Sequence, residues 1–439
     1  MQKYYLNSPG GKIDFLLPDT WRVVNNAVLK AEKVSKSISE LVTEAVGSPL
    51  GTPPLSSLLK GKKSVTVIVD DLTRPTPKKA ILTALFELFD TSGVRKDQVT
   101  VVIGLGTHRP LTGSEIEETF GPALCRGLRV VNHDCRAPDL VPVGTLRYGG
   151  ELKIHPAAAA ADLLIAVGSI LPHPFAGFGG GPKLVLPGIA NFEAIRRHHL
   201  ALMIADGVVL GNCEGNPWRD EIYEAAALAE LDFVVNAIFD ADEDVKAIVA
   251  GDYQEAHPIG AAMCAKELGV AYDQTADVTI TSAFPYTEGP QILKPLVAAT
   301  MVTKKGGTLL IYAGGIKGGR FPESLLEAFD VAFSAAAGGD TRQLVIDCLR
   351  DGKCVVPNAP MDFNSALNTV LLAQKRIRTL LISPDTDEDQ VRRLGFDYVP
   401  SLQQAIEMIA RDRSSATVNI LPSGGLVLPL LADGIRFSW

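Results

Sequence analysis

The chain has few of the residues that build a metal site from protein side chains alone. Its 439 residues include seven His and six Cys, and no two cysteines have the C-x-x-C spacing. The sequence therefore argues against a zinc ribbon, an iron–sulfur site and a thioredoxin motif. Scattered cysteines are typical of a reduced cytoplasmic protein, and a chain of this length can stabilise its cores without disulfides.

An excess of positive charge and long apolar runs are also missing. The 42 basic and 50 acidic residues give a net charge of −8, which argues against a nucleic-acid-binding protein. No segment approaches the roughly 18 uninterrupted apolar residues of a membrane helix, and the amino terminus lacks the apolar run of a signal peptide. We therefore expect a cytoplasmic protein that binds neither nucleic acid nor membranes.

Short β-branched runs alternate with segments of helical length, which predicts an α/β fold. Strands are expected at residues 64–71, 98–105 and 162–167, and helices at 77–89 and 112–124. This alternation implies parallel strands covered by helices on both faces. Ligands of such folds bind at the carboxyl ends of the strands.

A second run of the same kind begins near Asp277 and predicts two α/β domains with mainly parallel sheets flanked by helices. We expect an N-terminal domain at residues 1–272, joined by the C-terminal stretch 417–439. Residues 273–416 would form a second domain that closes over the substrate. The active site of such a protein is expected in the interdomain cleft.

Two expected strands end in polar residues that could form a site. The first ends at Asp70 and Asp71 and continues to Arg74, whose planar fork can bind a carboxylate or phosphate. A surface pair of Asp71 with Arg74 is the alternative. The second ends in G-x-G-T-H-R, where Arg109 replaces the third glycine of a dinucleotide fingerprint, so that match fails. What remains is His108 at a strand end, where ligands bind, although a lone His is more often structural.

The next strand leads to H-P-F-A-G-F-G-G-G-P-K, which begins at His173 and ends at Lys183. Glycines there let the backbone approach a ligand and turn N–H groups toward an anion. A Walker A loop would need Ser or Thr after the Lys, so this is not a nucleoside-triphosphatase loop. The alternative is a glycine-rich turn with a solvated Lys, but we expect no structural reason for so many glycines beside a His.

Two further clusters have residue types suited to ligand binding. His198 and His199 are adjacent on an expected helix and point about 100° apart, so at most one of them binds a metal. A solvated helix face is the alternative. Pro290 suits a first helical turn, which sets Gln291 and Lys294 on one face at the positive end. They could hold an anionic substrate, or form an exposed polar face.

In this order, the motifs D-D-x-T-R-P-T-P, G-x-G-T-H-R, H-P-F-A-G-x-G-G-G-P-K, H-H and G-P-Q-x-x-K resemble the lactate racemase family, which uses a nickel-pincer nucleotide. The resemblance implies nickel pyridinium-3,5-bisthiocarboxylic acid mononucleotide as cofactor, tethered to Lys183. It also implies that Gly179, Gly180 and Gly181 lie close to this cofactor and that His199 is the nickel ligand. The cofactor would then supply the sulfur ligands that the scattered cysteines do not.

The activity that the resemblance implies is racemisation or epimerisation of a 2-hydroxy acid through its 2-oxo acid. One His removes the hydroxyl proton while a hydride passes to the cofactor, and the hydride returns to either face of the carbonyl. His108 and His173 match the family's two bases, and an imidazole pKa near 6.5 suits this proton transfer.

Substrate-binding positions of the family match Arg74, Gln291 and Lys294. The resemblance also implies that Asp71 is among the cofactor-binding residues, and we expect its carboxylate to fix Arg74 or Lys294. Pro290 stands where some members have a tyrosine, so malate, an aryl lactate or a sugar acid is as plausible a substrate as lactate.

Two other classes of function compete with this interpretation. A two-lobed binding protein for a small organic anion is typically exported and has no need of paired His. A nicotinamide dehydrogenase is disfavoured by the broken glycine fingerprint. The resemblance also implies the cofactor's biosynthesis proteins as partners, and leaves a homo-oligomer open.

Overall fold

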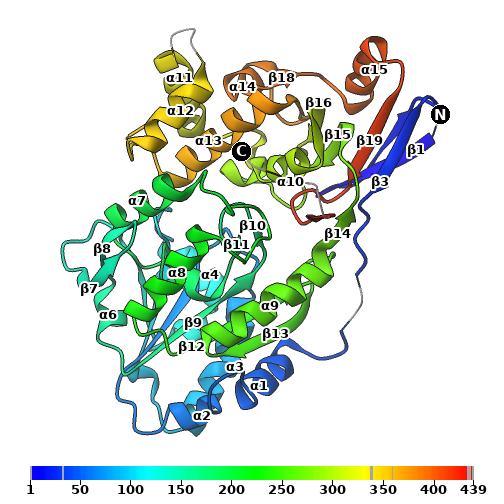
Figure 1. Cartoon of the computed structure of the whole chain (residues 1–439). Helices are drawn as coiled ribbons and strands as arrows, with labels where there is room; N and C mark the ends of the chain where they lie inside the picture. The colour runs from blue at the N-terminus through cyan, green and yellow to red at the C-terminus, as the bar shows by residue number, and fades with distance from the viewer. Residues whose placement is uncertain (1, 32–33, 337–339, 358, 433–436, 438–439) are drawn as a thin grey trace. The chain divides into compact units, whose positions relative to one another are not determined.

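The computed structural model describes residues 2–31, 34–336, 340–357, 359–432 and 437. The chain divides into two compact units, both of which mix helices with a central sheet (Figure 1). Unit 1 comprises Met1–Leu29 and Leu268–Trp439, and unit 2 comprises Lys30–Glu267. This confirms the predicted fold class of two α/β domains with mainly parallel sheets.

Unit 2 contains a six-stranded sheet in the order β13-β12-β9-β4-β5-β6, in which all neighbours are parallel except β12 and β13. Its strands are β4 (Val65–Asp70), β5 (Val99–Gly104), β6 (Arg129–Asn132), β9 (Leu163–Ile170), β12 (Phe233–Phe239) and β13 (Val245–Gly251). Every residue of β4 and β9 is buried, as expected for strands with helices on both faces. The chain changes direction across the sheet between β4 and β9, which is where open α/β sheets bind ligands.

Helices and short hairpins surround this sheet. The α-helices are α1 (Ile38–Gly47), α2 (Leu55–Leu58), α3 (Lys78–Thr91), α4 (Gly113–Phe120), α5 (Pro122–Cys125), α6 (Pro156–Ala159), α7 (Phe192–Leu202), α8 (Pro217–Leu228) and α9 (Tyr253–Leu268). The described part of this unit also contains two 3₁₀ turns and two hairpins: η1 (Lys96–Gln98), η2 (Gly181–Leu184), β7 (Val141–Leu146) with β8 (Gly150–Ile154), and β10 (Pro172–His173) with β11 (Gly177–Phe178). The helix expected at 112–124 is interrupted at Gly121, whose φ of 83° ends α4.

Unit 1 is built on a second six-stranded sheet, all parallel, in the order β18-β17-β16-β15-β19-β3. These strands are β3 (Trp21–Asn26), β15 (Ala276–Ser282), β16 (Thr303–Tyr312), β17 (Arg378–Ile382), β18 (Asp397–Tyr398) and β19 (Ala416–Leu421). The remaining elements are β1 (Gln2–Ser8), β2 (Gly11–Leu17), β14 (Gly269–Tyr272), η3 (Gly289–Leu293), α10 (Pro295–Met301), η4 (Lys317–Gly319), α11 (Glu323–Ala336), α12 (Thr341–Arg350), α13 (Met361–Arg376), α14 (Glu388–Arg393), α15 (Leu402–Asp412) and β20 (Leu428–Leu431).

Two parts of the expected domain division differ from these units. The first 29 residues belong to unit 1, because β3 pairs with β19 at the edge of its sheet. The expectation that residues 417–439 return to the first domain is wrong for their described part. Strand β19 pairs with β15, and β20 pairs with β14. The expected boundary near residue 272 lies close to the division at Glu267 and Leu268.

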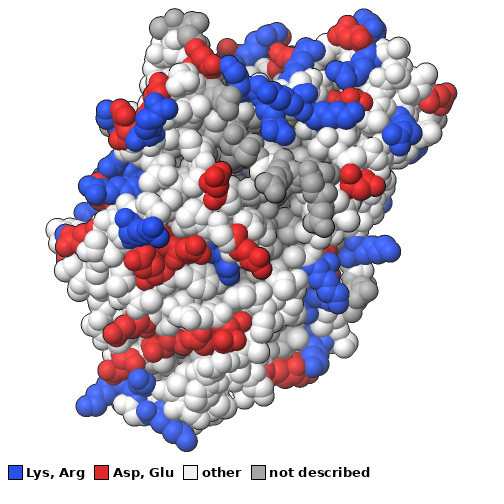
Figure 2. Space-filling view, in the orientation of Figure 1, with Lys and Arg blue, Asp and Glu red and all other residues white. Residues whose placement is uncertain are grey.

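The surface contains both kinds of charge. Figure 2 shows Lys and Arg interspersed with Asp and Glu over the face in view. Among the described residues, the structure has no helix with the length and apolar character needed to cross a membrane.

Candidate active site

Three adjacent strands of unit 2 end beside the predicted site residues. Strand β4 is followed by Asp71, β5 by the loop that carries His108, and β9 by the hairpin that contains His173. Because β9, β4 and β5 are neighbours and parallel, their carboxyl ends share one edge of the sheet. The sequence therefore positions all three side chains at the edge where ligands bind.

Buried Asp71 forms a pair with the partly exposed His108. The Nδ1 atom of His108 lies 2.5 Å from Oδ2 of Asp71, and the other carboxylate oxygen accepts the N–H and the hydroxyl of Thr73 at 3.0 and 2.6 Å. Burial opposes ionisation of Asp71. The hydrogen bond and charge of His108, the charge of Arg74 and the Thr73 hydroxyl nevertheless hold its pKa well below the usual range. An ionised Asp71 accepts a hydrogen bond from the N–H at Nδ1 of His108, so a neutral His108 has its lone pair on Nε2.

This pairing changes the role expected for Asp71. Its hydrogen bonds go to His108 and Thr73, so it orients a predicted base, while Arg74 acts on it through charge. Arg74 itself donates to the carbonyl and hydroxyl of Thr73 at 3.2 and 2.9 Å. The surface pair of Asp71 and Arg74 considered from the sequence is therefore wrong as a description of Asp71, which is 6% exposed.

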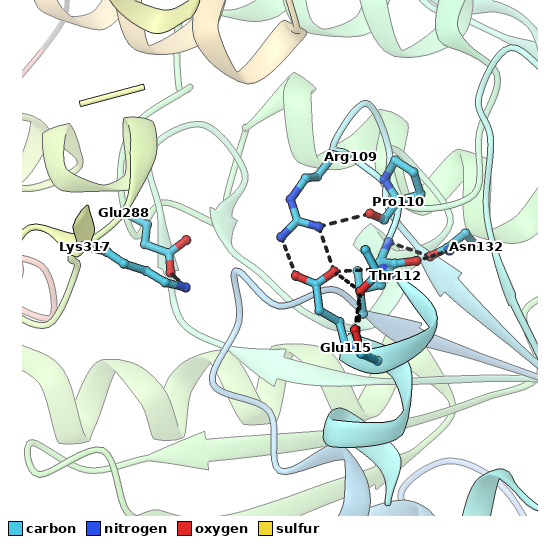
Figure 3. A network of polar contacts seen from close by, with 9 residues as sticks. Arg109, Pro110, Thr112, Glu115, Asn132, Glu288 and Lys317 are labelled. Carbon is cyan, nitrogen blue, oxygen red and sulfur yellow. Dashed lines mark hydrogen bonds and ion pairs between the residues drawn. The ribbon is translucent and has the colours of Figure 1, made fainter. Parts of the chain in front are cut away.

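The loop after His108 is fixed by a polar network at the start of α4 (Figure 3). Arg109 forms a two-pronged ion pair with Glu115, with distances of 2.9 and 2.6 Å. Glu115 also accepts the backbone N–H of Thr112, which completes a capping box, and Asn132 bonds the backbone of the same loop. Arg109 thus has a structural role next to the predicted base.

The glycines of residues 177–181, which run from β11 into η2 and are called the glycine-rich loop below, are required by the fold at most of their positions. Gly177, Gly180 and Gly181 have positive φ angles. A Cβ on them would come within 2.2, 2.7 and 2.6 Å of neighbouring atoms, respectively. The expectation that nothing structural demands these glycines is wrong for these three. Gly179 is different, because a Cβ there would lie no closer than 3.7 Å to the nearest described atoms, the carbonyl oxygens of Leu171 and Ser169. Its missing side chain is therefore not explained by packing.

The segment that follows this loop lies directly on the strand ends. A Cβ on Gly104 of β5 would lie 3.3 Å from the Cα of Gly188, and one on Gly168 of β9 would lie 3.0 Å from Leu184. Small residues in these strands therefore let the turn that contains Lys183 approach the sheet edge. Burial, and next the charge of Arg74, lower the pKa of Lys183 to about 7, against the opposing charge of Asp71. A substantial fraction of this amine is thus neutral and nucleophilic near pH 7.

One buried tryptophan, which sequence reasoning missed, connects the remaining site residues. The Trp218 ring, at the start of α8, lies 5.5 Å from the His173 ring, 4.2 Å from His198 and 4.9 Å from His199, between centroids. The amine of Lys183 lies 5.8 Å from the same ring. Trp218 is fully buried. In the sequence, Trp218 stands out only as an aromatic residue after a proline at the expected start of a helix. That pattern does not indicate which residues the ring contacts.

The two adjacent histidines have different environments. His198 is fully buried, and its Nδ1 lies 2.6 Å from Glu221, which also accepts the backbone N–H of Gly149 at 2.8 Å. The solvated helix face considered from the sequence is therefore wrong for His198. His199 donates its Nδ1–H to the Ile195 carbonyl at 2.9 Å, so its lone pair lies on Nε2. Burial, together with the nearby His198 and Lys183, holds the pKa of His199 well below its ordinary value, which favours the neutral, metal-ligating form.

His173 has the opposite hydrogen-bonding state to His108. Its Nδ1 accepts the backbone N–H groups of Phe175 and Ala176 at 3.2 and 3.1 Å. A neutral His173 therefore has its proton on Nε2, whereas His108 has its lone pair there. The two predicted bases thus present a donor and an acceptor in this state.

The predicted substrate residues of unit 1 lie on consecutive turns. Gln291 is part of η3, and Lys294 follows it at the start of α10, so the two share a side of the 3₁₀ turn. The Oε1 atom of Gln291 is buried and has no hydrogen-bond partner among the described residues. The amine of Lys294 lies 4.6 Å from the Tyr286 ring centroid. Nearby in sequence, Glu288 pairs with Lys317 at 2.6 Å (Figure 3).

Known proteins resemble this chain over nearly its whole length. The family model described as the lactate racemase N-terminal domain matches residues 10–211. A lactate racemase of Thermoanaerobacterium thermosaccharolyticum is 34% identical over 69% of this chain and 72% of that protein. A lactate racemase of Lactiplantibacillus plantarum is 28% identical over 92% of this chain and 93% of that protein.

Solved structures agree with this. The lactate racemase apoprotein structure from T. thermosaccharolyticum matches with a TM-score of 0.83 and 27% identity, covering 98% of this chain and 100% of that one. A Thermotoga maritima protein shares the fold, with a TM-score of 0.64 at 20% identity. The chain belongs to the lactate racemase family. The enzyme class predicted from the sequence, a racemase and so an isomerase, is confirmed.

Proposed function

We propose that this enzyme racemises lactate or a closely related 2-hydroxy acid through its 2-oxo acid, with a nickel-pincer nucleotide tethered to Lys183. One observation carries the proposal. Around the single ring of Trp218, unit 2 gathers the Lys183 amine, His199 and His173, while the charge of His108 acts on His199. These are the groups that the family resemblance assigns to tethering, metal binding and proton transfer.

The residues present fit such a cofactor. Among the described residues, the Nε2 atom of His198 and the indole N–H of Trp218 are buried without a hydrogen-bond partner. Buried polar atoms of this kind normally have a partner, and a bound group can supply it. Gly179 leaves room beside the loop, and no group of three His, Cys, Asp or Glu forms a metal cage in the described part of the chain. A nickel ion held here would therefore need ligands from its own cofactor.

Each holding residue has a distinct task in this proposal. Lys183 has an amine that is partly neutral near pH 7, as covalent attachment requires. His199 offers an Nε2 lone pair to nickel, and Gly179, Gly180 and Gly181 allow close approach of the nucleotide. When bound, the cofactor would supply an acceptor and donor for the substrate's hydride.

We assign proton transfer to His108 and His173. His108 offers its Nε2 lone pair to the substrate hydroxyl, and the ionised Asp71 stabilises the positive charge that forms on the ring. His173 offers an Nε2–H to the oxygen of the 2-oxo acid. To accept a proton at Nε2 for the opposite enantiomer, His173 would have to give up its contacts with the N–H groups of Phe175 and Ala176.

Carboxylate recognition is proposed for three further residues. Arg74 provides a guanidinium fork in unit 2, and in unit 1 Gln291 and Lys294 provide an amide and an ammonium. The unpartnered Oε1 of Gln291 is an acceptor that a hydroxyl group of a ligand would satisfy. The names of the relatives favour lactate, while malate, an aryl lactate or a sugar acid stays within the proposed class.

The test is a chiral assay of the loaded enzyme. Protein made in the cytoplasm of a host that also expresses the cofactor's biosynthesis proteins is given pure L- or D-lactate, and both enantiomers are followed by chiral chromatography. We expect either enantiomer to reach a 1:1 mixture, since the two are equal in energy. Malate and an aryl lactate, assayed in the same way, rank the alternatives. No inversion of any of these acids by loaded protein would refute the proposed function.

A further inference from the structure

A buried histidine outside the proposed reaction centre contacts the glycine-rich loop. His257 lies on α9 and is 2% exposed. Its Nε2 lies 2.8 Å from the carbonyl oxygen of Gly179, and its Nδ1 lies 2.8 Å from the Tyr223 hydroxyl. Arg219 in turn donates to that hydroxyl at 2.5 Å. A continuous series of hydrogen bonds therefore runs from α8 through α9 to the loop.

The partners set the direction of the hydrogen bonds in this series, in which Arg219 also lies 3.4 Å from Nδ1 of His257 as a second, longer donor. A carbonyl only accepts, so Nε2 of His257 must hold a proton and Nδ1 must accept the proton of Tyr223. Arg219 only donates, so the Tyr223 oxygen accepts from it and directs its own proton to His257. Burial is the main cause that lowers the pKa of His257 to about 4, so the ring is neutral at pH 7, as this arrangement requires. Tyr223 and Arg219 thus select one tautomer of His257.

The loop end of this series leads to the Lys183 turn. The carbonyl oxygen of Gly180 accepts the backbone N–H of Lys183 at 3.1 Å, and Gly181 donates its N–H to buried Asn236 at 2.8 Å. The peptide between Gly179 and Gly180 is planar, so holding one end of it fixes the direction of the other. His257 and Asn236 therefore hold the two consecutive peptides Gly179–Gly180 and Gly180–Gly181, which lead into the turn that carries Lys183.

We propose that His257 is a positioning residue that fixes the glycine-rich loop, and through it the turn that carries Lys183, with Tyr223 and Arg219 keeping its tautomer. The assignment of Lys183 as the tether rests on the proposed function. The effect on the loop does not, because it is a property of the protein without cofactor. This role depends on the direction of the hydrogen bonds of His257. A side chain that only filled the same space would not perform it.

Two tyrosines on the same aromatic cluster give a matched test. Tyr223→Phe removes the hydroxyl that sets the tautomer of His257. Tyr253→Phe removes a hydroxyl from a ring 5.6 Å away, and that hydroxyl accepts a hydrogen bond from Gln254, outside the series. Amide hydrogen exchange is measured on cofactor-free protein. We expect Tyr223→Phe to speed exchange in residues 177–184 by about 2- to 10-fold, the range for loss of one hydrogen bond, and Tyr253→Phe to leave it unchanged.

A second pair of variants tests the histidine itself. His257→Gln keeps an N–H donor for the Gly179 carbonyl, and His257→Leu does not. We expect His257→Gln to restore much of the loop protection that His257→Leu loses, and the same order in the fraction of Lys183 that carries cofactor after co-expression. Equal loop exchange in Tyr223→Phe, Tyr253→Phe and the wild type would overturn the inference, even if His257→Leu fails to fold. An inactive wild type with a normal loop response would instead refute only the proposed function.

Discussion

The reactivity of the Lys183 amine follows from its surroundings in the fold. A lysine in water keeps its proton far above pH 7, but burial and the neighbouring Arg74 lower the pKa of this amine to about 7. Asp71 acts in the opposite direction. A lysine whose amine is partly neutral at physiological pH is a candidate nucleophile, and this property is independent of any bound group.

The first prediction concerns this amine in cofactor-free protein. Brief acylation at a series of pH values, read by peptide mass spectrometry, should label Lys183 with a midpoint near pH 7, well below the roughly 10.4 of a lysine in water. Arg74→Ala removes a nearby positive charge, so it should raise the midpoint for Lys183. A midpoint for Lys183 near 10 in the unsubstituted protein would contradict the assigned environment.

The second prediction concerns the pair of Asp71 and His108. Asp71→Asn keeps the shape but removes the charge that orients and stabilises a protonated His108, so kcat should fall by about 10²- to 10⁴-fold. The kcat of His108→Ala should fall by a factor in the same range, and both variants should still carry cofactor on Lys183. Asp97→Asn, which changes an exposed aspartate paired with Arg95, is the control. Wild-type turnover of both lactate enantiomers by Asp71→Asn would rule out the assigned role.

Part of the site could be predicted residue by residue, and part could not. His108, His173, Lys183 and Asp71 stand at strand ends or in a segment of unusual composition, so their position along the chain indicated them. Trp218 contributes through its neighbours in space, and those neighbours come from two other segments of the chain. His257 is in the same situation. No local pattern shows which backbone carbonyl a buried histidine will reach.

At the scale of elements, the glycine-rich loop combines two requirements. Gly177, Gly180 and Gly181 are glycines because the backbone turns with positive φ and passes close to other atoms. Gly179 has no such reason in the packing. The sequence showed only the density of glycines, and the separation of structural from ligand-facing positions required the coordinates.

The third prediction separates these requirements with single methyl groups. Gly180→Ala should lower the free energy of unfolding by more than the roughly 1 kcal/mol that a left-handed backbone alone costs, because its Cβ would lie 2.7 Å from Ser169 O. Gly127→Ala is the control, with the same φ of 75° and nothing within 4 Å. Denaturant unfolding measures both. If both variants lost the same free energy of unfolding, the loop would be able to accommodate the Gly180 methyl group without strain.

Gly179→Ala completes this series. Its methyl group meets no close neighbour, so unfolding should be as in the wild type, while the fraction of Lys183 that carries cofactor should fall. Full loading of Gly179→Ala would contradict the assignment of this position to the cofactor.

Strands were the most predictable elements. Fully buried parallel strands such as β4 and β9 appear as continuous apolar runs, which sequence patterns detect well. The capping box at Thr112 was equally visible and is confirmed. The end of that helix could not be predicted, because the apolar pattern continues past Gly121. The helix ends there because Gly121 has a φ of 83°.

At the scale of the whole molecule, the division into units depends on pairings between distant segments. Strand β3, near the amino terminus, pairs with β19, almost 400 residues later. No local pattern in either strand indicates the other as its partner, so the sequence could not assign them to one sheet. The fold class was predictable because it needs only the alternation of elements, whereas the course of the chain between units was not.

The fourth prediction concerns stability in acid. His133 and His257 are buried and have pKa values lowered to about 4, mainly by burial. Between pH 6.5 and 4 the unfolded chain binds protons that the folded chain does not, so stability should fall as the pH falls through this window. Each group could remove up to about 3 kcal/mol. Above pH 6.5 their contribution should be constant.

Thermal unfolding at a series of pH values checks this. His133→Gln keeps a donor for the Ala190 carbonyl but cannot titrate, so its Tm should depend less steeply on pH between 6.5 and 4 than that of the wild type. Curves of identical slope would show that His133 does not take up a proton on unfolding.

The most direct test of the account is a peptide mass spectrum of the enzyme that racemises lactate. The account predicts an added mass confined to the peptide that contains Lys183, together with nickel in the intact protein. It also predicts that Lys183→Ala abolishes both the adduct and the activity. An active preparation in which the Lys183 peptide has its unmodified mass would contradict the central claim.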